Sequence, residues 1–169
     1  MNNPTRFPLR NTQAGFTLVE LGVVTVIISL LAMMAVQAFK RISVRSRTSA
    51  VLNDFRVIGG AMNAYSMEKG GWPPTTAAGV LPAAMQGYVI SSNFTSPSPI
   101  GGYYTWATNS LQSGTTYQAV IIISSANGNN ITTDAGQLAD IDKRGDDGNL
   151  ATGNILLGAS NYLVYVVAR

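Results

Sequence analysis

Residues Leu21–Phe39, with the sequence LGVVTVIISLLAMMAVQAF, contain no charged side chain and only three polar ones, Thr25, Ser29 and Gln37. Their 19 positions approach the roughly 20 residues that a helix needs to cross the apolar core of a bilayer. A secretory signal peptide is the alternative, but its apolar part usually spans about 7–15 residues and ends at a cleavage site of small residues. Here the run is longer and continues into a basic stretch that is compatible with a helix. We therefore expect a membrane-spanning helix that is kept in the mature protein.

The overall composition argues against several classes of function. The 169 residues include no cysteine and no histidine, so the chain lacks disulfides, thiolate zinc ligands and the commonest general base near neutral pH. It also has no P-loop, Gly-x-Ser-x-Gly or HExxH motif. The net charge of +3 comes from basic residues on either side of the apolar run, and the rest is nearly neutral. We therefore expect that the protein is not an enzyme and that its soluble part does not contact nucleic acid.

A short motif directly precedes the apolar run. Residues 1–15, MNNPTRFPLRNTQAG, are basic, contain two prolines and no acid, and are followed by Phe16-Thr17-Leu18-Val19-Glu20. This arrangement resembles the signature of the type IV pilin and type II secretion pseudopilin superfamily. In that signature a basic leader ends in glycine, and Phe-Thr-Leu, one apolar residue and a glutamate then open a membrane helix. The resemblance is specific because all of these features occur in register.

The resemblance implies a processing step and three parts of the chain. A membrane-embedded prepilin peptidase would cut between Gly15 and Phe16 on the cytosolic side and would N-methylate the new amine of Phe16. A glycine suits such a site because it lets the backbone bind close to the catalytic groups. Residues 1–15 would then be the leader peptide, 16–39 the transmembrane helix and filament core, and 40–169 a soluble pilin-like head that includes the second half of the long helix.

Glu20 is the charged residue at the start of the apolar helix. A carboxylate at the edge of hydrocarbon costs several kcal/mol unless it is neutralised or paired. One interpretation places it in the headgroup layer, where a helix N-terminus mildly favours negative charge. The resemblance implies instead that Glu20 pairs with the Phe16 amine of an adjacent subunit and sets the axial register of assembly.

The resemblance also implies where the protein acts and with which partners. It places the chain in the bacterial inner membrane with one span and a periplasmic head, and then in a periplasmic or cell-surface filament. The basic residues that follow the span weakly favour the opposite orientation, but the cleavage site must meet its peptidase in the cytosol. The implied partners are copies of the chain, other pilin-like subunits, the prepilin peptidase, an inner-membrane assembly platform and the membrane.

Within the superfamily we predict a structural subunit of a type II secretion pseudopilus, which serves protein export. The small head with a Trp-Pro-Pro loop and the absence of cysteine for a C-terminal disulfide favour this assignment. A type IV pilus subunit and a DNA-uptake pilus subunit are alternatives, because they share the N-terminal motif. A membrane-anchored binding head that never polymerises is a further alternative.

The long helix is predicted to continue from residue 16 to residue 69 and to end at Gly70-Gly71. Its second half carries one apolar stripe at helical spacing, and Gly59-Gly60 in it indicates a bend or close packing. Many family members have a helix-breaking Gly and Pro at the positions of Ser29 and Gln37, so we expect a straighter and more continuous helix here. The stripe consists of Val44, Val51, Phe55, Ile58, Met62 and Tyr65.

The remainder predicts an α+β fold, in which the second half of the helix packs against a small antiparallel sheet of three to four strands. A short helix is expected within Val80–Met85, and the last two strands are expected to form a hairpin. The predicted strands are rich in β-branched and aromatic residues and are bounded by Gly, Asn or Ser. They are Tyr103–Thr108, Tyr117–Ser124, Asn154–Gly158 and Asn161–Ala168.

The other segment that could carry chemistry is a group of five aspartates, and calcium is its natural ligand because calcium prefers oxygen donors. The resemblance adds that major pseudopilins of type II secretion bind calcium near their C-terminal end. An EF-hand fits poorly, because Arg144 and Ala151 stand where acidic or amide ligands belong. The alternative is a helix over 135–144 that ends in an Asp-Asp-Gly turn with solvated acids. Asp134 opens the group, and the candidate calcium ligands are Asp140, Asp142, Asp146 and Asp147.

Overall fold

The structure is a computed structural model, and it describes residues 15–158 and 160–169. Residues 1–14 of the predicted leader lie outside this range. The chain divides into two compact units, one that runs up to Arg41 and one that comprises Ile42–Arg169.

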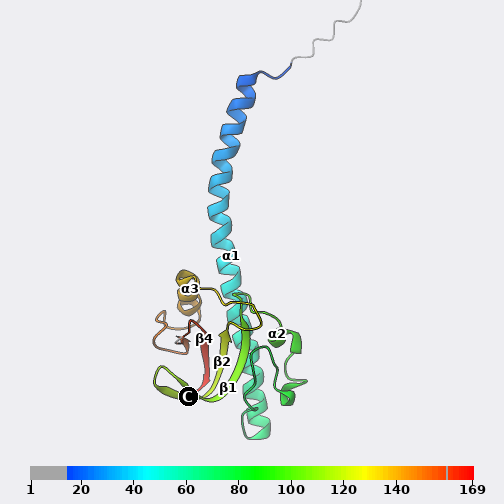
Figure 1. Cartoon of the computed structure of the whole chain (residues 1–169), viewed down its shortest axis with the longest axis vertical. Coiled ribbons are helices and arrows are strands. Elements are labelled where there is room, and N and C mark those ends of the chain that lie inside the picture. The colour runs from blue at the N-terminus through cyan, green and yellow to red at the C-terminus, as the bar shows by residue number, and fades with distance from the viewer. Residues whose placement is uncertain (1–14, 159) are drawn as a thin grey trace, which may run out of the picture. The chain divides into compact units, whose positions relative to one another are not determined.

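A single helix, α1, runs from Leu18 to Lys69 (Figure 1). The predicted continuity through Ser29 and Gln37 is confirmed, since neither position interrupts it. The Ser29 hydroxyl donates a hydrogen bond of 2.7 Å to the carbonyl of Thr25 one turn earlier, so its polar group is satisfied within the helix. At the other end Gly70 takes a φ of 73°, a left-handed conformation that glycine adopts without a steric penalty, and the helix stops there.

Four strands form one antiparallel sheet in the order β1-β2-β4-β3. A two-residue loop joins β1 to β2, and both of its residues have positive φ, as is usual for tight hairpins. The predicted C-terminal hairpin is confirmed by the antiparallel pairing of β3 with β4. The strands are β1 (Tyr103–Gln112), β2 (Thr115–Ser124), β3 (Ile155–Leu157) and β4 (Leu163–Ala168).

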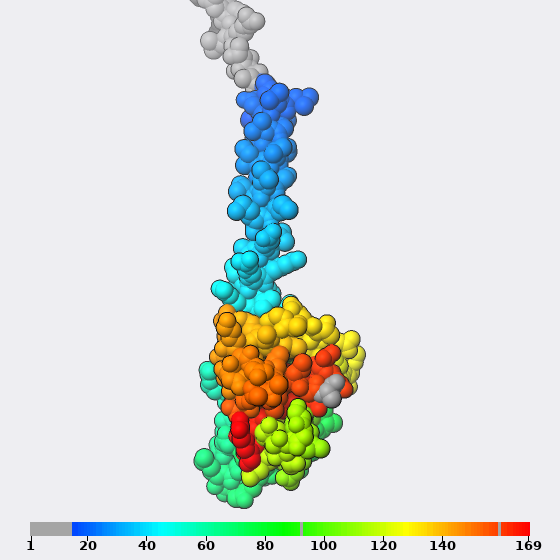
Figure 2. All heavy atoms as spheres, turned by 90° about the vertical axis from the view of Figure 1, so that its left-hand side faces the viewer, coloured from blue at the N-terminus to red at the C-terminus, as the bar shows by residue number. Residues whose placement is uncertain are grey.

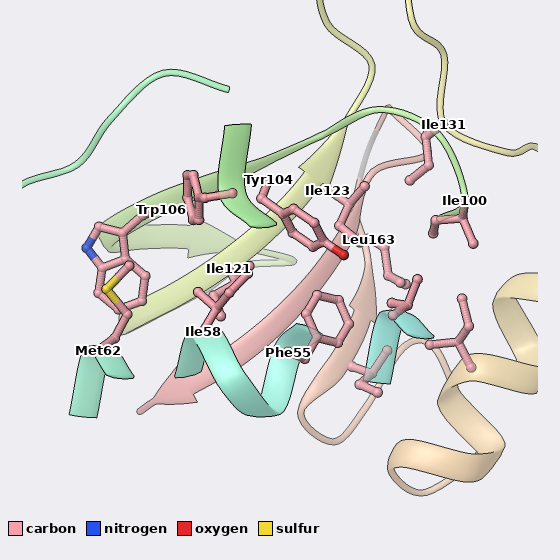
Figure 3. Packing of buried hydrophobic residues seen from close by; sticks show 14 of the residues in the cluster. Phe55, Ile58, Met62, Ile100, Tyr104, Trp106, Ile121, Ile123, Ile131 and Leu163 are labelled. Carbon is pink, nitrogen blue, oxygen red and sulfur yellow. The ribbon is translucent and has the colours of Figure 1, made fainter. Parts of the chain in front are cut away.

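The core of the second unit lies between one face of this sheet and the C-terminal half of α1 (Figure 3). Phe55 of α1 stacks on Tyr165 of β4 at a centroid distance of 4.9 Å and meets Tyr104 of β1 edge-on at 6.4 Å. A Cβ added at Gly59 would lie 3.4 Å from the Tyr165 ring, so this glycine marks close packing. Four of the six predicted stripe residues are fully buried, and Val44 and Tyr65 are partly buried.

Three short helices complete the unit, and two of them were predicted. The 3₁₀ helix η1 (Ala83–Met85) lies within the predicted segment, and α3 (Ala135–Gly145) matches the predicted helix to within one residue. Asp134 caps α3, because its Oδ1 accepts from the backbone N–H groups of Gly136 and Gln137. The helix α2 (Ser91–Thr95) was not predicted, and it carries the fully buried Phe94 into the core.

Candidate functional site

The N-terminal motif lies at the entrance to α1 in an exposed backbone segment. Gly15, Phe16 and Thr17 precede the first helical residue, Leu18, and the Phe16 side chain is 84% exposed. A Cβ added at Gly15 would meet no atom within 4 Å. The peptide bond between Gly15 and Phe16 is therefore outside the helix and accessible, as a proteolytic site requires.

Glu20 and Thr17 together form a capping box at the start of α1. The Glu20 Oε2 accepts hydrogen bonds from the Thr17 backbone N–H at 2.9 Å and from the Thr17 hydroxyl at 2.8 Å. In return the Thr17 Oγ1 accepts from the Glu20 backbone N–H at 3.2 Å. Two backbone donors without intrahelical partners are thereby satisfied. This role was not predicted, although the Thr-x-x-Glu spacing is its known sequence signal.

The hydrogen bonds to the Glu20 carboxylate from the described residues all fall on Oε2. The local cap therefore occupies one oxygen of the carboxylate. Oε1 keeps its capacity to accept from a further donor, such as an amine.

The first turns of α1 present apolar side chains on every side. Within the described residues this helix is the one long and apolar enough to cross a membrane, and its most apolar window is entirely unburied. Figure 2 shows these side chains as the blue surface around the helix. A helix that is apolar all round needs a lipid or protein environment that covers it. The exposed large side chains include Leu18, Val23, Ile27, Leu30, Leu31, Met34 and Phe39.

A second candidate site lies at the C-terminal end of α3. One carboxylate oxygen from each of Asp142, Asp146 and Asp147 lies within 4.8 Å of the others. Asp142 is fully buried, and neither of its carboxylate oxygens has a hydrogen-bond partner among the described residues. Burial, together with the nearby carboxylates of Asp147 and Asp146, raises the pKa of Asp142 to about 6.

The other two carboxylates are positioned by the loop that leads to β3. Asp146 Oδ2 accepts from the backbone N–H of Asn154 and from that of Ile155, the latter at 3.0 Å. Asp147 accepts from the Asn149 backbone N–H at 2.8 Å and from the Thr152 hydroxyl at 2.7 Å, and these bonds lower its pKa. The Asp-Asp-Gly turn is thus held in place by its own side chains.

Asp140 belongs to a different set of contacts. Its Oδ1 accepts from Arg144 Nε at 2.9 Å, and its Oδ2 accepts from the Thr48 hydroxyl of α1 at 3.0 Å. Residues two positions apart on a helix do not face the same way, so Asp140 and Asp142 point to different surroundings. The structure therefore brings together three of the four predicted calcium ligands and leaves Asp140 out.

Comparisons with known proteins agree with both the motif and the fold. Residues 10–36 match the family model of the prokaryotic N-terminal methylation motif. The chain is 35% identical over 97 residues to the fimbrial protein EcpC of Eikenella corrodens. Its structure is similar to that of the major type IV pilin PilA1 from Clostridium difficile, with a TM-score of 0.52 at 17% identity. The chain thus carries the N-terminal methylation motif and has the fold of a type IV pilin.

The extent of the similarity differs between these two proteins. The likeness to the Clostridium difficile pilin covers 76% of this chain and 98% of that one, and at this identity it shows the pilin fold alone. The similarity to the Eikenella protein covers 57% of this chain, which spans 63% of that protein's length. The motif match includes Gly15, Phe16 and Glu20, so the superfamily motif and the capping box coincide at the start of α1.

Proposed function

We propose that this chain is a structural subunit of a type IV pilin-like filament. The observation that carries the proposal is the methylation motif at the start of a helix whose large apolar side chains are exposed. In the membrane, lipid would cover these side chains. In a filament, the same helices of neighbouring subunits would cover them, so one surface serves both states.

The proposed processing converts Phe16 into the N-terminal residue. Cleavage after Gly15 by a prepilin peptidase would create an α-amine two residues before the start of α1, and methylation would keep its positive charge. The Gly15–Phe16 bond lies in an exposed, non-helical segment, which supports its access to a protease. The parts of the chain would then be residues 1–15 as leader, 16–39 as membrane helix and 40–169 as head.

The proposed assembly contact joins Glu20 of one subunit to the Phe16 amine of the next. The capping box holds the Glu20 carboxylate at the helix end and uses Oε2, and Oε1 would accept from the incoming amine. In an apolar filament core a charge-assisted hydrogen bond of this kind is strong, and an unpaired carboxylate is costly. The pair would therefore favour one axial register.

The proposed location is the bacterial inner membrane, with the head in the periplasm before assembly. The chain would there contact the prepilin peptidase, the assembly platform and other pilin-like subunits. The type II secretion pseudopilus remains our sequence-based prediction for the finer assignment. The similarity to a protein named as fimbrial supports a type IV pilus as the second candidate.

A deletion and localisation experiment tests the proposal and separates the two candidates. Antibody to the head should label filaments by immunogold electron microscopy in cells that express the chain, and the label should be absent from the deletion strain. Surface filaments lost on deletion would indicate a pilus, whereas loss of protein export without loss of surface filaments would indicate a pseudopilus. Label that stays in the inner membrane, with both phenotypes normal, would contradict the proposal and favour the static anchor.

A further inference from the structure

A depression on the surface of the head lies where the Trp-Pro-Pro loop after α1 meets the strands β1 and β2. Its volume is about 400 Å³, which is within the range of pockets that bind small molecules. None of the residues that line it is charged, and two of them carry side-chain amides. They are Trp72, Pro73, Pro74, Thr108, Asn109 and Gln118.

The loop side of the depression is held against β1 by hydrogen bonds and ring packing. The indole N–H of Trp106 donates to the carbonyl of Pro73 at 2.9 Å, and the backbone N–H of Thr108 donates to the hydroxyl of Thr75 at 3.0 Å. The Trp72 ring lies 5.7 Å from the ring of Trp106, which is fully buried. The wall is therefore formed in advance, so that a ligand would pay little for ordering it.

Asn109 has a backbone conformation that is unusual for a strand. Four of the described residues other than glycine have a positive φ, and Asn109, at 50°, is the one of these that lies inside a strand. Consecutive strand residues ordinarily face opposite sides of a sheet. The left-handed conformation of Asn109 accounts for the fact that Thr108 and Asn109 line the same depression. Residues held in such conformations are concentrated at functional sites.

The polar groups that line the depression are free to bind a ligand. Asn109 and Gln118 are exposed, and their amides make no side-chain hydrogen bond within the described part of the chain. The indole N–H of the half-buried Trp72 has no such bond within the same residues either. An amide both donates and accepts hydrogen bonds, as a ligand hydroxyl does. The depression therefore offers two amides beside one aromatic ring.

We propose that this depression binds a neutral sugar unit of the hexose or N-acetylhexosamine class. The sugar hydroxyls would exchange hydrogen bonds with the amides of Asn109 and Gln118. A C–H face of the sugar ring would lie on the Trp72 indole, whose π face is electron-rich. An anionic ligand is disfavoured because no charged residue lines the depression.

Other classes of ligand fit this lining less well. A proline-rich peptide binds in a groove lined by several aromatic rings, whereas one aromatic ring lines this depression. Single-stranded nucleic acid needs basic groups for its backbone in addition to rings, and no basic residue is present in the lining. The inference concerns the head alone and does not depend on whether the chain forms filaments.

A fluorescence titration of the full chain tests the site, in micelles of a detergent without a sugar headgroup. Two sources of the sugar are distinguished by two probes, the N-acetylglucosamine tetramer for cell-wall glycan strands and the glucose tetramers of cellulose and starch for hexose polymers. At least one probe should bind saturably and change the tryptophan emission. The change would come from Trp72, because Trp106 is buried.

Two variants and a matched control locate the binding. Asn109→Gly removes one amide and keeps a residue that tolerates a φ of 50°, and Gln118→Ala removes the other amide at an exposed position. Each should weaken binding by roughly fivefold or more, since a hydrogen-bonding amide is lost. The control Asn127→Gly makes the same change at an exposed turn residue with a φ of 51° outside the depression, and it should bind as the native chain does.

Three results would overturn the proposal. One is the absence of saturable binding of every probe to the native chain. Another is equal affinity of the native chain and both amide variants, and if one variant does not fold the other decides. The third is an equal loss of binding in the control Asn127→Gly, which would place the bound sugar elsewhere on the head.

Discussion

The role proposed for Glu20 has two components, a local helix cap and a charge pair between subunits, and substitutions can separate them. Glu20→Gln keeps the capping box, because a Gln side chain also accepts from the Thr17 backbone N–H. It removes the negative charge. Thr17→Ala does the reverse, because it removes the hydroxyl that pairs with Glu20 and keeps the charge.

The expected magnitudes differ clearly between these variants. Loss of a helix cap costs about 0.5–2 kcal/mol. Breaking a buried ion pair by removing one charge costs about 3–5 kcal/mol, which corresponds to roughly 150-fold to several thousand-fold in the affinity of a subunit for its neighbour. We expect Glu20→Gln to be processed and inserted normally but to be almost absent from filaments. Thr17→Ala should still assemble, with at most a modest loss.

The assay compares the inner-membrane and filament fractions of cells that express each variant at equal level. Quantitative immunoblotting gives the fraction of subunits in filaments, and the ratio of mature to precursor chain reports processing. Normal filament incorporation of Glu20→Gln would refute the charge pair. If Thr17→Ala failed as completely as Glu20→Gln, the cap rather than the charge would explain the requirement for Glu20.

The head carries three further predictions, all measured by urea-induced unfolding followed by tryptophan fluorescence. Tyr104→Phe should destabilise the head by about 1.5–3 kcal/mol, because the Tyr104 hydroxyl donates a hydrogen bond of 2.6 Å to Asp54 of α1. Tyr103→Phe is the matched control, and an equal loss of stability in both variants would contradict this prediction. Gly60→Ala should stabilise the head by up to about 1 kcal/mol, since its added methyl meets open space. Gly145→Ala should destabilise the head by about 1–3 kcal/mol, because the added methyl would lie 2.5–2.6 Å from apolar side chains of α1 and β3. A gain in stability would contradict this packing.

Much of the fold follows from the sequence because its elements have regular apolar periods. The stripe that contains Phe55 and Ile58 was recognisable at helical spacing, and both residues are fully buried. The C-terminal hairpin followed from two β-rich runs with a short gap. By contrast, the residues of α2 have a loop-like composition, and tertiary burial of Phe94 accounts for their helical conformation. The strand β1 extends to Gln112, beyond the predicted end at Thr108, because pairing with β2 continues through polar residues.

The candidate sites were predicted less completely than the fold. Spacing identified the three members of the aspartate cluster but also included Asp140, which lies outside it. Asp140 and Asp142 point in different directions on one helix, and Asp142 is the one that turns toward the Asp-Asp-Gly loop. Burial of Asp142 depends on tertiary packing that no local pattern encodes. The Glu20 cap was not predicted although its Thr-x-x-Glu signal is present in the sequence, because the place of Glu20 beside the apolar run favoured roles in the headgroup layer and in assembly.

The N-terminus of the subunit in isolated filaments is the most direct test of the central claim. Filaments sheared from cells or collected from a periplasmic fraction can be purified, and the N-terminal peptide of this chain can be sequenced by mass spectrometry. The account predicts a peptide that begins with N-methylphenylalanine at Phe16. A chain that is found only in membranes and retains Met1 at its N-terminus would contradict it.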